Sequence, residues 1–176
     1  AVGRNMRTFE MCSSPQANAM LMTGRTIRIF LADGKPSGIL TAEIMNWTGK
    51  VVVCPRTDLQ RLADRPECRR SGAYILAGPD PDDPYGERAY IGESDNVFAR
   101  LKQHAADASK EFWTRCALII SKDENLTKAH VKYLESRLVG LAHEASRCVL
   151  ENGNDPSSPS LPESDIADME FFLSQL

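Results

Sequence analysis

The sequence lacks the features of a membrane-spanning chain, of a disulfide-stabilised domain and of a simple zinc-binding module. No stretch approaches the ~20 consecutive apolar residues that a transmembrane helix needs. The five cysteines form no Cys-x-x-Cys pair and have no histidines at ligand spacing, which argues against both a disulfide framework and a zinc site. We therefore expect a cytoplasmic protein with reduced thiols and no membrane partner.

Basic residues are missing from the C-terminal part of the chain. Residues 151–176 carry six acidic groups and no Lys or Arg. Since the whole chain has 21 Lys and Arg against 24 Asp and Glu, residues 1–150 keep 18 acidic groups and a net charge of +3. Such an excess is a weak sign of nucleic-acid binding by itself. We expect residues 155–176 to form an acidic linker and helix, of the kind that is usually solvated.

The first 70 residues are predicted to contain a leader and a small extension. Residues 1–25 have no continuous apolar block between charge and a cleavage site, so we expect a disordered leader, native or left from cloning. Residues 26–70 are predicted to form an α+β extension too small to hold a core alone. Its strands and short helical segment are expected over 27–31, 39–45, 50–54 and 59–64.

A second module over 71–154 is predicted to have the order β-β-α-β-α. The segment over 78–86 has three prolines and two glycines and is predicted to be a loop between two strands. Ser94 or Asp95 is expected to cap the first helix, which runs to about residue 108. The strands are expected over 73–77, 88–92 and 116–121. The long helix over 127–147 has an apolar stripe made by Val131, Leu134, Leu138, Leu141 and Ala145.

Three polar side chains lie beside the apolar stripes of these helices. Arg100 and His104 are four residues apart, hence on one face of the first helix. Glu135 edges the stripe of the long helix, where a carboxylate is costly unless it meets a metal ion or a cation. Taken singly, each residue is typical of a solvated side chain or of a salt bridge at the rim of a core.

Read in order, these residues resemble the GIY-YIG endonuclease family, over about residues 71–154. Ala73 stands where the family usually has isoleucine, a loss of bulk that should leave Tyr74 in place. The resemblance implies an α+β core in which a three-stranded antiparallel sheet is flanked by helices. The matching residues are Gly72-Ala73-Tyr74, Tyr90-Ile91-Gly92-Glu93-Ser94, Arg100, His104, Glu135 and an asparagine after the long helix, Asn152 or Asn154.

The resemblance implies a metal-dependent endonuclease that hydrolyses phosphodiester bonds in double-stranded or branched DNA, leaving 5′-phosphate and 3′-hydroxyl ends. Glu135 would be the only protein ligand of Mg²⁺, or of Mn²⁺, because hard oxygen ligands suit such ions. Tyr74 would activate the attacking water or relay its proton. Since an unperturbed tyrosine has a pKa of ~10, nearby positive charge such as Arg100 must favour its phenolate.

The remaining residues would hold or orient the phosphate. Arg100 would grip it in bidentate fashion, Tyr90 would orient the water or the phosphate, and His104 would act as a base or as a phosphate donor. Asn152 would contact the site or the backbone, with Asn154 as the fallback. Arg100, Lys102, His104 and Lys128 are the predicted nucleic-acid contacts, and Lys110, Lys122 and Lys132 are further surface lysines that could follow phosphates. Phe112 and Trp113 are predicted to be buried rather than to stack on a base.

Two alternatives stay open. The module could bind nucleic acid or a partner on the same fold without cutting it. The chain could also be an accessory component of a bacterial defence or repair system, with residues 26–70 recognising a protein partner. Double-strand cleavage by one small site would require two copies, so a homodimer is also expected as a possibility.

Overall fold

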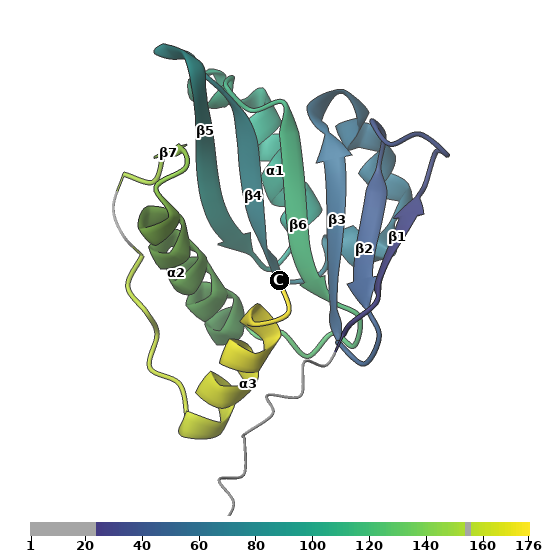
Figure 1. The fold of residues 1–176 in the computed structure, drawn as a ribbon, viewed down its shortest axis with the longest axis vertical. Coiled ribbons are helices and arrows are strands. Elements are labelled where there is room, and N and C mark those ends of the chain that lie inside the picture. The colour runs from purple at the N-terminus through teal and green to yellow at the C-terminus, as the bar shows by residue number, and fades with distance from the viewer. Residues whose placement is uncertain (1–23, 154–155) are drawn as a thin grey trace, which may run out of the picture.

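The computed structural model describes residues 24–153 and 156–176, so that most of the predicted leader and Asn154 lie outside the described residues. The protein is α+β, with helices on both faces of one mixed sheet (Figure 1). Its elements in chain order are β1 (Ile27–Leu31), β2 (Leu40–Ile44), β3 (Gly49–Pro55), the 3-10 helices η1 (Arg56–Asp64) and η2 (Pro66–Arg69), β4 (Gly72–Asp80), β5 (Asp83–Ser94), α1 (Val97–Ala106), the 3-10 helix η3 (Ala108–Lys110), β6 (Arg115–Ser121), α2 (Lys128–Ala145), β7 (Val149–Leu150) and α3 (Glu163–Leu173).

The sheet has seven strands in the order β1-β2-β3-β6-β4-β5-β7, where a three-stranded sheet was expected for the second module. The predicted strands are present as the adjacent set β6-β4-β5. Strand β3 extends this set by pairing antiparallel with β6 over seven residue pairs, from Gly49↔Ser121 to Pro55↔Arg115. Without β3, the N–H and C=O groups along one edge of β6 would lack partners. The N-terminal extension therefore continues the sheet of the second module.

Alternation along the strands produces two cores, one on each face of the sheet. Under α1, η1 and η2 lie Val52, Tyr74, Leu76, Leu118 and Ile120, with Val97 and Leu101 of α1 and Trp113. Under α2 and α3 lie Ala73 and Ile119, with Val131 and Leu134 of α2, Trp47, Met169 and Phe172. The predicted burial of Trp113 is confirmed, since its side chain is fully buried, and Phe112 packs partly buried against the same core.

The segment over 78–86 is not a loop, because β4 and β5 continue through it and leave only a tight turn at residues 81 and 82. Proline is tolerated here because each strand has lost one neighbour. The last β4 residue paired with β6 is Ala77, and the pairing of β5 with β7 covers only Arg88 and Ala89. Pro79 and Pro84 lie beyond these limits, where a missing N–H costs no ladder bond to a second strand.

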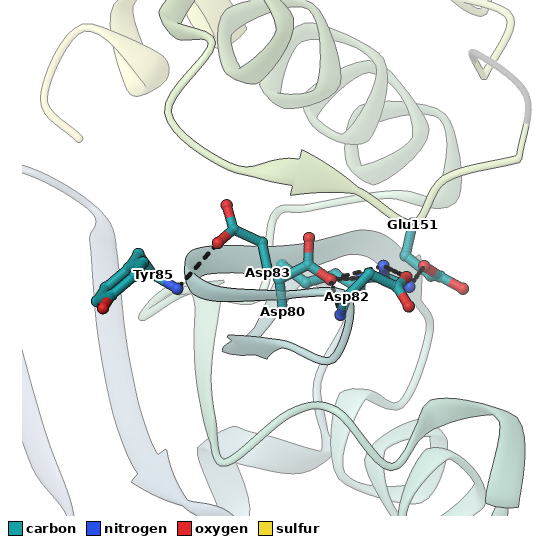
Figure 2. Close-up of polar contacts among 6 residues, drawn as sticks. Asp80, Asp82, Asp83, Tyr85 and Glu151 are labelled. Carbon is teal, nitrogen blue, oxygen red and sulfur yellow. Dashed lines mark hydrogen bonds and ion pairs between the residues drawn. The ribbon is translucent and has the colours of Figure 1, made fainter.

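Carboxylates gather where this hairpin meets the segment after β7 (Figure 2). The Arg88 guanidinium donates to Asp80 Oδ1 and to Asp82 Oδ2, both at 2.7 Å, and to Glu151 Oε2 at 2.9 Å. Asp80 is buried, so its charge depends on this partner. The network ties the tip of the β4–β5 hairpin to the C-terminal segment. Tyr85 lies outside it and is almost fully exposed.

Side chains cap both long helices at their N-termini. The Asn96 side chain, not that of Ser94 or Asp95, caps α1 by accepting from the Ala99 N–H at 3.0 Å. Thr127 and His130 form a reciprocal capping box on α2. Only the first half of the predicted stripe on α2 is buried. Leu141 is 43% exposed and Ala145 is exposed, so the apolar stripe does not stay buried to the end of α2.

The acidic helix α3 is docked and not simply solvated. The Tyr133 hydroxyl donates to Glu170 Oε1 at 2.7 Å, and Arg137 binds the same carboxylate. The Phe172 ring packs against Trp47, with 5.1 Å between the two ring centroids. Among the helices of the described residues, none has the length and apolar character needed to cross a membrane.

We predict that Phe172→Ala lowers the free energy of unfolding by about 3 kcal/mol, because a buried aromatic ring is removed from the second core. Phe171→Ala is the matched control. Its ring is 59% exposed, and its loss should cost less than about 0.5 kcal/mol. Urea unfolding followed by circular dichroism gives both values. Equal effects of the two substitutions would contradict the docking of α3.

Candidate active site

The polar residues singled out by sequence converge around the hydroxyl of Tyr74. Tyr74 lies on β4, and α1 places His104 over the same face of the sheet. The Tyr74 hydroxyl and His104 Nε2 are hydrogen-bonded at 2.7 Å. Both side chains are buried, with exposed fractions of 1% and 5%. Tyr90 of β5 completes a cluster of three rings, with centroids 5.3 Å from His104 and 6.3 Å from Tyr74.

Two glycines make room for this arrangement. Gly92 is paired directly with Tyr74 across β4 and β5, and a Cβ atom there would lie 2.4 Å from the Tyr74 Oη. The phenol therefore crosses β5 in the space that a side chain would fill. A Cβ on Gly72 would meet the Ile119 carbonyl oxygen at 2.5 Å and the Ile120 Cγ2 at 2.8 Å, so β4 and β6 also need a glycine there. Both glycines are needed because there is no room for a Cβ atom, and not because of their backbone conformation.

Arg100 approaches the same hydroxyl from α1. Its side chain is exposed, and interaction with the Tyr74 hydroxyl raises the pKa of the guanidinium. Arg100 Nη1 also donates to Gln103 Oε1 at 2.9 Å. In the neutral imidazole tautomer that carries its proton on Nδ1, Nε2 accepts the hydrogen bond from the Tyr74 hydroxyl.

Electrostatics differ from the sequence-based expectation for Tyr74. Burial raises the pKa of Tyr74 above its ordinary value, and the lowering effect of Arg100 is too small to offset it. The phenol is therefore protonated at neutral pH, and the expected phenolate is not favoured. The reason is that Tyr74 lies in the first core, where a phenolate would lose its hydration.

His104 is held in its neutral form. Burial, and after it the positive charges of Arg100 and Lys110, lower the pKa of His104 from 6.5 to about 4. A neutral imidazole can accept a hydrogen bond from the phenol, but its lowered pKa makes it a weak base. It is not suited to bind phosphate as a cation, which was one of its two expected roles. Tyr74 and His104 are therefore both uncharged at neutral pH and hydrogen-bonded at 2.7 Å.

Glu135 belongs to α2, which covers the opposite face of the sheet, yet its charge reaches Tyr74 and raises the pKa of the phenol. Burial and then the carboxylate of Glu93 raise the pKa of Glu135 itself. Among the described strands, none pairs with this edge of β5 beyond Ala89, although the Asn152 side chain binds the Ile91 backbone, so the two faces meet near the end of β5. Among the described residues, no three His, Cys, Asp or Glu side chains converge as a metal-binding group.

A groove of about 460 Å³ lies beside this edge, between the end of β5, the start of α1 and the first turn of α2. Arg100 and Lys128 contribute basic groups to its lining, and Glu93 and Asp95 contribute acidic ones. Lys128 Nζ is already bound to Glu93 at 2.7 Å and to Asp95 at 3.5 Å. Lys128 therefore already binds two carboxylates of the protein, where the sequence predicted that it would bind phosphate. Glu93, at the end of the Tyr90–Ser94 motif, was not assigned a role from sequence.

Asn152 binds the backbone of β5. Its Oδ1 accepts from the Ile91 N–H at 3.0 Å, and its Nδ2 donates to the Ile91 carbonyl at 2.8 Å. These two bonds act like one more residue pair of the ladder between β5 and β7. Asn152 therefore fixes the strand that carries Tyr90 and Gly92. The alternative, Asn154, lies outside the described residues.

We predict that acid destabilises the protein through His104. Because the folded-state pKa of His104 is about 4 and the ordinary value is 6.5, the unfolded chain binds one more proton between these values. The free energy of unfolding should therefore fall as the pH drops from 6.5 to 4, by up to about 3 kcal/mol. Denaturant unfolding of the wild type and of His104→Gln across this range measures it. Parallel curves for the two proteins would refute the prediction.

Comparison of the chain with protein-family models, with curated proteins and with solved structures yields no match. What the site does is therefore inferred from its own residues and their geometry.

Proposed function

We propose that the chain is a metal-dependent endonuclease with a GIY-YIG core formed by β4, β5, α1, β6 and α2. The observation that carries the proposal is the hydrogen bond from Tyr74 to His104, with Arg100 beside it and Glu135 within electrostatic reach. These groups come from β4, α1 and α2, elements far apart in sequence. Packing alone does not require a buried phenol, imidazole and guanidinium to share one hydroxyl, whereas phosphodiester hydrolysis uses such a set.

The donor chemistry near Glu135 fits a divalent cation. Glu93 and Glu135 are neighbouring carboxylates, and their mutual repulsion contributes to the raised pKa of Glu135. A hard cation with most of its waters retained needs only one or two protein carboxylates. We infer that Glu135 holds Mg²⁺ or Mn²⁺. When bound, the ion supplies positive charge to the phosphate and to the leaving 3′-oxygen.

The side chains around Tyr74 divide the remaining work. The Tyr74 oxygen takes a proton from the attacking water while its own proton passes to His104 Nε2. Neutral His104 is the final acceptor, so no phenolate has to form beforehand. The resulting hydroxide attacks phosphorus, the P–O3′ bond breaks, and the leaving 3′-oxygen takes a proton from solvent, which gives 5′-phosphate and 3′-hydroxyl ends. Arg100 stabilises the extra negative charge on the phosphate, and Tyr90 orients the water.

The substrate is proposed to be DNA, double-stranded or branched, approached through the groove beside the edge of β5. Arg100 is the exposed basic side chain that joins this groove to Tyr74. Cleavage of both strands would need a second copy.

We predict that the purified protein nicks supercoiled plasmid with Mg²⁺ and is inactive with EDTA. Glu135→Gln removes the carboxylate charge without changing its size and should lower the nicking rate at least about 10³-fold. Glu144→Gln, on an exposed position near the end of α2, is the matched control and should cleave like the wild type. Binding of plasmid, branched and single-stranded DNA without any cleavage would instead support a non-catalytic binding module.

A second prediction concerns Tyr74. Tyr74→Phe should lower the cleavage rate by about 10² to 10⁴-fold, since it removes the group that exchanges protons with water. Gly92→Ala should act in the same direction because its Cβ displaces the Tyr74 hydroxyl. Single-turnover rates at saturating Mg²⁺ separate these effects from weaker metal binding. Wild-type rates for Tyr74→Phe would refute the relay while leaving the other assignments in place.

A further inference from the structure

We propose that Lys110 is a phosphate-binding residue of the site and that Arg56, from the N-terminal extension, positions it. The inference rests on the proposed nuclease function and adds to it a basic contact for the nucleic-acid backbone outside the family motifs. Lys110 ends η3, in the segment that links α1 to β6. Its Nζ lies over the Tyr90 ring, 4.3 Å from the centroid.

Lys110 is distinguished from the other lysines by what surrounds it. Its charge reaches the buried His104 and helps to lower the pKa of that imidazole, which places the ammonium close to the relay. Lys128 is neutralised by Glu93 and Asp95. Lys102 lies over Phe98, 4.9 Å from the ring centroid, and is ~200° around α1 from Arg100. Of these three lysines, Lys110 alone contacts a residue of the three-ring cluster.

The segment that carries Lys110 is held from both sides. At β4, a Cβ atom on Gly78 would lie 2.1 Å from the Phe112 carbonyl oxygen, so the segment passes against the strand where only glycine fits. The Thr114 N–H donates to the Ala77 carbonyl at 2.9 Å. Asp107 caps η3 by accepting from the N–H and the hydroxyl of Ser109. This packing leaves the backbone of η3 little freedom.

On the other side, Arg56 clamps the segment through its carbonyl oxygens. Its Nη2 donates to the Ala105 carbonyl at 3.1 Å, and its Nη1 reaches the carbonyls of Lys110, Glu111 and Trp113 at 3.1–3.4 Å. The guanidinium also lies over the Trp113 ring, 4.8 Å from its centroid. Lysine cannot reproduce this planar set of donors. Arg56 thus connects the start of η1 to the residue that faces Tyr90.

A cation at this position has a clear use. Phosphodiester backbones carry one charge per nucleotide, so a strand with its scissile phosphate at Arg100 presents neighbouring phosphates within reach of the rim of the site. Lys110 would bind one of them, independently of base sequence. Its ammonium is held by a weak contact with a ring face, and this is lost at little cost when a phosphate arrives.

The test is DNA binding by Glu135→Gln in EDTA, so that cleavage plays no part. Anisotropy of a labelled duplex at increasing NaCl gives the affinity and the slope of log K against log salt. Adding Lys110→Ala should weaken binding about fivefold and reduce the slope by about one, and Lys110→Arg should restore both. Lys35→Ala, at an exposed position between β1 and β2, is the matched control and should change neither. An unchanged slope for Lys110→Ala would overturn the proposal.

The role of Arg56 is tested in the same assay. Arg56→Lys keeps the charge but loses the clamp, so it should reduce the slope as Lys110→Ala does, and the double variant should show no further loss. Additive effects, or a slope unchanged by Arg56→Lys, would overturn the positioning role. Plasmid nicking by the wild type is measured in parallel. A Lys110 effect on binding without any nicking would reject the proposed function and keep the phosphate contact, whereas no binding at all would reject both.

Discussion

The candidate site depends on one close contact across a strand pair, that of the Tyr74 hydroxyl with Gly92. Tyr74 starts in the core under α1, and only the missing side chain at Gly92 lets its hydroxyl cross β5. The open edge of β5 is where residues from both faces of the sheet can meet. His104 and Arg100 approach from the α1 face, and Glu135 approaches from the α2 face. Any side chain at position 92 would separate the phenol from its partners.

Burial decides how this site can move protons. A phenol in the core keeps its proton, and an imidazole beside two cations stays neutral. Separately, each shift would remove the residue from acid–base chemistry near neutral pH. Tyr74 and His104 are joined by a hydrogen bond of 2.7 Å. In the proposed mechanism, Tyr74 would pass its proton to His104 only while it takes another proton from the attacking water. The proposed relay would thus avoid a buried phenolate, whose desolvation Arg100 does not offset.

The sequence predicted most elements but not how they join. Periodicity located β1, β2, β3, β6 and α2 because each has its own apolar pattern. Periodicity failed at residues 78–86, where the prolines predicted a loop. Prolines fit in these strands because each strand has only one neighbouring strand there, and the sequence does not show this. The β3–β6 pairing and the two-residue β7 had no local signal, since strand pairing joins segments far apart in sequence. The family resemblance carried by Arg100, His104 and Glu135 predicted a site, yet the pKa of Tyr74 and the ion pair of Lys128 follow only from packing.

The net charge of −3 gives a poor picture of the site, because three of the six acidic groups in residues 151–176 bind basic side chains away from Tyr74. Glu170 is held by Arg137 and Tyr133, and Asp165 by His130, all on α2. Glu151 is held by Arg88 near the hairpin tip. The cations that remain near Tyr74 are Arg100 and Lys110, and both act on His104. A local positive potential can therefore exist around one hydroxyl in an acidic chain, and Arg56 ties that potential to the N-terminal extension. On this view the extension contributes to the proposed site, because Arg56 binds carbonyl oxygens of the segment that carries Lys110.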